Sequence, residues 1–143
     1  MITSKLKTAL TAAGCTLVLY EAKELAGVIT DQSKQNDLIG LILQPTSIRF
    51  ELKGNGIHEH YPPVTVEIMK QVKPEDTAEN NEATLNLIIS AVKAFVTSLI
   101  STGDFKKITS FEADKILESR YDANVIGLSI PLDLFLIENK DNC

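Results

Sequence analysis

Strict alternation of apolar and polar positions marks the C-terminal part of the chain. Between Asn124 and Glu138 the aliphatic residues Ile126, Leu128, Ile130, Leu132, Leu134 and Leu136 take every second position. A period of two belongs to a strand, because a helix repeats every 3.6 residues. The pattern therefore predicts a long terminal strand over this range.

A helical period appears at two other places. A short helix is predicted at the N-terminus, ended by Gly14, and a longer one in the second half, ended by Gly103. The apolar positions that define them are Ile2, Leu6 and Leu10 in the first, and Leu85, Ile88, Ile89, Val92, Phe95, Val96 and Leu99 in the second.

Shorter apolar runs predict the remaining strands. Their ranges are Thr16–Tyr20, Leu38–Gln44, Ile48–Lys53, Val64–Val72 and Ile108–Leu117. The nearly continuous apolar run at Leu38–Gln44 predicts burial on both faces, whereas the alternation at Ile48–Lys53 predicts a half-buried strand that forms a hairpin with it. The polar, proline-bearing stretch Ile57–Pro63 is expected to be a loop.

These elements predict one α+β domain over residues 1–143. The expected architecture is one mostly antiparallel sheet with two helices packed on one face. A chain of 143 residues with 44% hydrophobic residues suits a single core of ordinary size.

The last strand carries Pro131 and Asp133 on its polar side. Because proline has no backbone N–H to donate, the strand is expected to be an edge or to bulge at that point. An edge can pair with another copy of the chain, or its own chain can cover it, and the sequence leaves both open.

Charge and cysteine content narrow the classes of function. A net charge of −5, with no basic cluster longer than Lys106–Lys107, disfavours wrapping of nucleic acid. Cys15 opens an apolar stretch and is expected to be buried, and with Cys143 it makes no disulfide framework. With no apolar stretch judged long enough to span a membrane, we expect an intracellular protein.

His58 and His60 form the one pattern in the sequence that could ligate a metal ion. In a strand they would point the same way, but no spacing supplies a third ligand, so a solvated loop is the preferred interpretation. We expect no catalytic residue, metal or cofactor. The protein is therefore not expected to be an enzyme. A small metal- or ligand-binding domain using these two histidines is the alternative. In the turn before the last strand, Arg120, Tyr121 and Asp122 are candidate contact residues, with a local salt bridge of Arg120 as the alternative.

The order of elements resembles the tail-terminator and tail-completion proteins of tailed bacteriophages. Two stretches carry the resemblance besides this order: Glu118–Gly127 running into the long last strand, and Ile57–Pro63, which looks like a segment of phage proteins of the Bacteroidetes type. The resemblance implies a virion structural protein that forms a ring, commonly a hexamer, at the head-proximal end of the tail. Such a ring stops tube growth and joins the tail to the head.

The same resemblance implies the partners. These are further copies of the chain, the tail tube protein, a neck or connector protein, and DNA that passes without specific binding, with no membrane. Assembly would take place in the cytoplasm of the bacterial host. A neck or head–tail connector ring is the alternative. The expected contact residues are Arg120, Tyr121, Asp122, Pro131, Asp133, His58, His60 and Tyr61.

Overall fold

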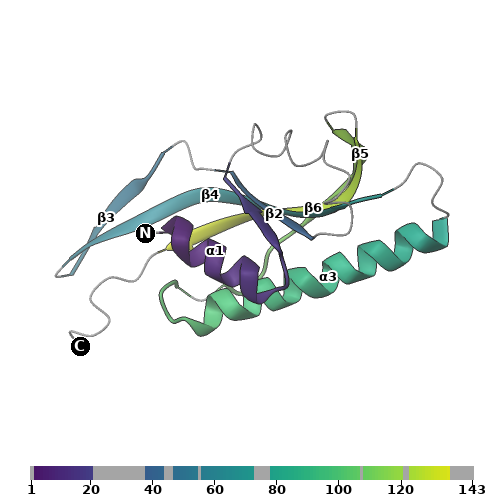
Figure 1. The fold of residues 1–143 in the computed structure, drawn as a ribbon. Coiled ribbons are helices and arrows are strands. Elements are labelled where there is room, and N and C mark those ends of the chain that lie inside the picture. Colours follow the sequence, from purple (N-terminus) through teal and green to yellow (C-terminus); the bar gives the residue numbers. More distant parts are fainter. Residues whose placement is uncertain are drawn as a thin grey trace.

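The structure is a computed structural model, and it describes residues 2–20, 38–43, 47–54, 56–72, 78–106, 108–120 and 123–135. Two helices and six strands lie in these ranges (Figure 1). They are α1 (Ile2–Ala12), β1 (Leu17–Leu19), β2 (Ile39–Leu43), β3 (Arg49–Lys53), β4 (Gly56–Gln71), α3 (Ala78–Ser101), β5 (Asp114–Arg120) and β6 (Ala123–Phe135).

The strands form one sheet in the order β1-β2-β4-β6-β5, with β3 beside β4 off this path. All pairs are antiparallel except β1 with β2, which is parallel. The long strand β4 organises the sheet: β6 pairs along most of one side of it, and β2 and β3 share the other side. The predicted class, an α+β fold with a mostly antiparallel sheet, is confirmed.

Both helices cover the same face of this sheet (Figure 1). Phe95 and Leu99 from α3 and Leu10 from α1 are fully buried against even-numbered positions of β4 and β6. The Nζ atom of Lys5 also lies 2.8 Å from Oδ2 of Asp104, which ties α1 to the segment that follows α3. The sequence predicted this arrangement correctly, including the positive-φ glycines after each helix, at positions 14 and 103.

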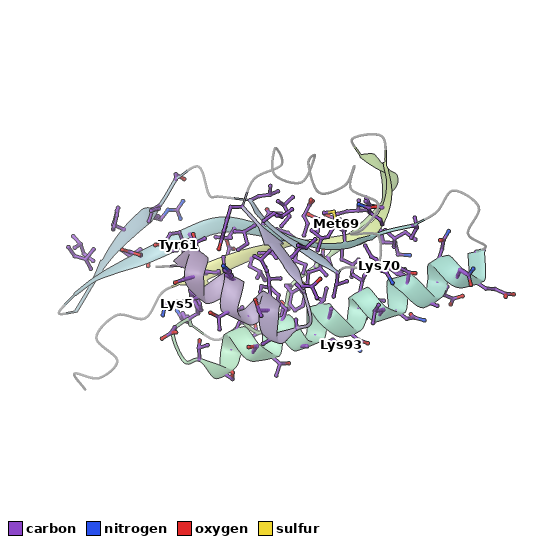
Figure 2. The ribbon with its side chains drawn as sticks, viewed as in Figure 1. Lys5, Tyr61, Met69, Lys70 and Lys93 are labelled. Carbon is purple, nitrogen blue, oxygen red and sulfur yellow. The ribbon has the colours of Figure 1, made fainter. Side chains whose placement is uncertain are left out.

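The second face of the sheet holds a smaller apolar cluster. Its buried members are Ile39, Leu41, Met69, Ile116 and Val125. Figure 2 labels Met69 at this position. Strand β2 therefore contributes buried side chains to both faces, as its continuous apolar run predicted.

The prediction that the last strand is an edge holds only locally. From Val125 to Ser129, β6 is an interior strand between β4 and β5. Pro131 pairs with Thr65 of β4 but lies beyond Ser129, where the pairing with β5 ends. A proline is tolerated there because, among the described strands, β6 has a neighbour on one side alone. Positions 136–138 of the predicted strand lie outside the described residues.

The prediction of a loop at Ile57–Pro63 is wrong, because this stretch belongs to β4. The two prolines lie where the register with β6 shifts, between Tyr61 and Val64. A bulge is a position at which a long strand can accept residues that donate no ladder hydrogen bond. The polar residues and prolines therefore bend a strand without ending it.

One strand pairing and two element boundaries also differ from prediction. Strand β3 forms its hairpin with β4 and not with β2, through the turn at Gly54, where φ is +56°. Helix α3 begins at Ala78, seven residues before Leu85, the first apolar position of the predicted helix. Residues 108–113 are not strand, because β5 begins at Asp114.

Candidate functional site

A two-stranded arm extends from one end of the sheet (Figure 1). It consists of β3 and the first residues of β4, Gly56–His60, and we call it the arm. The pairing of β6 with β4 stops at His60, and β2 pairs only with β4 residues from Thr65 onward. The arm is therefore a ribbon of two strands within the described part of the chain.

One face of the arm is apolar and exposed. Ile48, Phe50, Leu52 and Ile57 retain 45%, 62%, 81% and 52% of their accessible surface. Ile57 lies directly opposite Leu52 in the pairing of the two strands, so the four side chains form one surface, which we call the arm face. The expectation that alternation here means a half-buried strand is wrong, because the arm lies beyond the two helices that cover the sheet.

The arm face continues the helix-covered face of the sheet. Ile57, Glu59 and Tyr61 alternate along β4 and so point to one side, and Tyr61 is buried in the main core. The hydroxyl of Tyr61 donates a hydrogen bond to Oε2 of Glu59. This contact fixes a carboxylate at the boundary between the covered core and the exposed arm face, opposite Phe50.

The other side of the arm base is polar. His60 is buried, and its Nε2 atom lies 3.9 Å from Oδ1 of Asp133, whose side chain is largely exposed. Arg49 is the neighbour of His60 across the pairing of β3 with β4. The expectation of a solvated loop is therefore wrong for His60. A buried imidazole beside a bulge is a structural element of the arm base.

Three predicted contact residues lie at the arm base: His60 and Asp133 on its polar side, and Tyr61 on the opposite, helix-covered side. Pro131 is exposed on β6, two positions before Asp133. The backbones of His58 and Arg120 lie in β4 and β5, but their side chains fall outside the described part of the chain. The remaining predicted contacts are at positions 121 and 122, which also lie outside it.

The described residues offer little for covalent or metal chemistry. Among them, no group of three His, Cys, Asp or Glu side chains is placed to hold a metal ion. Cys15 is buried as predicted, and burial raises the pKa of its thiol from 9.0 to about 12. Because the thiolate is the reactive form, this cysteine is inert near neutral pH. Cys143 lies outside the described residues.

Helix α3 presents a second exposed surface of unusual composition. Its outward residues include Leu87, which is 50% exposed, and a series of small side chains, Ala83, Ser90, Ala94, Thr97 and Ser101. Lys93 is the one charged residue between positions 83 and 101 (Figure 2). We call this surface the α3 face.

By length and composition alone α3 could cross a membrane, and in the described ranges it is the one helix of which this is true. This differs from the expectation that the chain has no such segment. The apolar side of α3, with Ile88 and Phe95 fully buried, packs against the sheet, as a core helix does.

No protein-family model matches the chain, and no curated protein matches its sequence.

Proposed function

We propose that this chain is the subunit of a homo-oligomeric ring of the phage tail-terminator type. The ring, of six copies in the arrangement common to such proteins, ends the tail tube and joins it to the head. The observation that carries the proposal is the arm face, an apolar surface exposed to solvent on a two-stranded ribbon. Exposed apolar patches of this kind often mark a surface that binds another protein.

The sheet gives the arm a fixed direction. Strand β4 is continuous from the arm into the centre of the sheet, where it pairs with β2 and β6. A contact made by the arm therefore sets the angle between one copy and the next. A head-to-tail contact gives a closed ring when this angle brings the last copy back to the first, and an open filament when it does not.

The acidic balance of the chain supports the second part of the proposal. A net charge of −5 repels phosphate, which suits the lining of a channel through which DNA passes without sticking. Tight, salt-sensitive binding of DNA by the purified protein would contradict this part.

Two experiments test the role. Native mass spectrometry and negative-stain images of the purified protein are expected to show closed rings. The rings are then added to growing tubes of a tail tube protein from the same phage, and they are expected to cap one end and stop elongation. Rings that ignore tube ends but bind the head portal would transfer the assignment to a neck connector. A protein that stays monomeric at every concentration would refute the ring.

A further inference from the structure

We infer that the arm face of one copy packs on the α3 face of the next copy, with Glu59 of the arm against Lys93 of the helix. This inference rests on the proposed ring and specifies its subunit contact. It names two surfaces of the same chain that no contact within one copy can bring together.

The arm face is as large as the apolar patches that often serve as contact surfaces. At about 150 Å² for a fully exposed side chain of this size, its four residues expose roughly 360 Å². This equals the largest apolar patch of a typical monomer and nearly half of what one partner contributes to a standard interface. The remaining area would come from the polar residues around it.

The α3 face is the matching surface in the described part of the chain. It is uncharged apart from Lys93, and its small side chains let a sheet approach the helix closely. Leu87 supplies an exposed aliphatic side chain about one turn from the N-terminal end of this surface. From position 83 to position 101 the helix runs about 27 Å, long enough to receive the whole five-residue strand β3.

The charges of the two surfaces are complementary. Glu59 is the one carboxylate among the apolar side chains of the arm face, and Tyr61 holds it in place. Lys93 is the one ammonium group on the α3 face. If two arm faces met each other instead, each copy would bring a carboxylate and no cation, and like charges would oppose the contact.

The contact must join different copies. The arm continues the plane of the sheet, whereas the α3 face points away from that sheet, so an arm cannot fold back onto its own helix. Figure 1 shows the arm at one end of the molecule and the first turns of α3 at the other. Two unlike surfaces make a head-to-tail interface, which forms a ring when the rotation between copies brings the last copy back to the first.

A charge exchange tests the contact. Glu59→Lys and Lys93→Glu are each expected to raise the dissociation constant of the subunit contact by about tenfold or more, because each places like charges together. The double variant, and an equal mixture of the two single variants, are expected to restore assembly. Glu112→Lys and Lys115→Glu are matched controls, because both residues are exposed and belong to neither surface.

Leu52→Asp and Leu87→Asp are a second pair of variants, one on each surface. Both side chains are exposed, so thermal unfolding of the monomer should change little while assembly is lost. Sedimentation velocity and native mass spectrometry measure the association.

If the wild-type protein assembles but neither charge reversal weakens it, or the exchange does not restore it, this contact is refuted while the ring proposal stands. Rings that cap no tube would refute the terminator role but leave the contact intact, and a permanently monomeric wild-type protein would refute both.

Discussion

Replacing a phenylalanine by alanine should have very different costs on the arm and in the core. Phe50 is 62% exposed, whereas Phe95 is fully buried between α3 and the sheet. Full burial of such a side chain stabilises by about 1.5–3 kcal/mol, so the buried third of Phe50 contributes about 0.5–1 kcal/mol. Lost strand preference adds at most about 1 kcal/mol, which keeps Phe50→Ala below about 2 kcal/mol. Phe95→Ala leaves a cavity and should cost about 3–5 kcal/mol.

Urea unfolding followed by circular dichroism measures both variants. The protein is kept at a concentration where native mass spectrometry shows monomer, because assembly adds to apparent stability. The wild-type midpoint should rise at higher concentration, and this rise should vanish in Phe50→Ala but persist in a monomer-neutral control such as Lys115→Ala. A loss of 3 kcal/mol or more for Phe50→Ala in the monomer would place Phe50 in the core and remove the arm face from the reasoning.

Three further predictions concern the body of the fold. Gly127→Ala should cost about 1–3 kcal/mol in urea unfolding, because a Cβ there would lie 2.6 Å from a backbone oxygen. Gly56→Ala, with open space around it, should cost under about 1 kcal/mol. Equal costs for the two variants would contradict this reasoning. Cys15 should resist thiol reagents at pH 8 until urea is added, as peptide mapping would show. Because burial raises the pKa of its thiol from 9.0 to about 12, the contribution of Cys15 to the free energy of unfolding is complete below pH 9 and declines as pH rises toward 12. The Cys15→Ala variant should lack this decline. Lys5→Ala should cost at most about 1 kcal/mol, less in high salt, because its ion pair with Asp104 is partly exposed; a larger, salt-independent loss would point to packing instead.

The sequence predicted those elements whose periodicity is long and whose burial is simple. Helix α1, the core side of α3 and the alternation of β6 follow directly from the positions of their apolar residues. Local patterns identify such elements because each one buries a continuous stripe or face of its own.

The arm was misjudged because alternation reports which side chains share a face and not whether anything covers that face. Phe50 and Leu52 have the pattern of a half-buried strand but lie beyond the helices. Pairing is equally invisible locally, so β3 was assigned to β2 when its partner is β4. The prolines before Val64 suggested a loop, since a bulge and a loop use the same residues.

Of the candidate site, the sequence identified His60, Tyr61 and Asp133 but not the reason for their importance. They were selected as exposed contact residues, and two of them are buried at the arm base. Of the exposed apolar residues beside them, Phe50 and Leu52 were assigned to a half-buried strand and Ile57 to a loop. A five-residue hairpin with apolar side chains on one face, ahead of two prolines, is the signal that could have identified a projecting ribbon.

The pairing of β4 with β6 also determines the order in which the chain can fold. Even the ladder pair closest in sequence joins Gln71 to Val125, with all of α3 between them, so the central pairing closes a long loop. The arm hairpin and α3 involve local contacts and can form first, whereas the central ladder forms last and sets the folding rate. Until it forms, the core side of β4 is exposed to solvent in addition to the arm face. We therefore expect slow refolding, in milliseconds to seconds, with aggregation that increases with protein concentration.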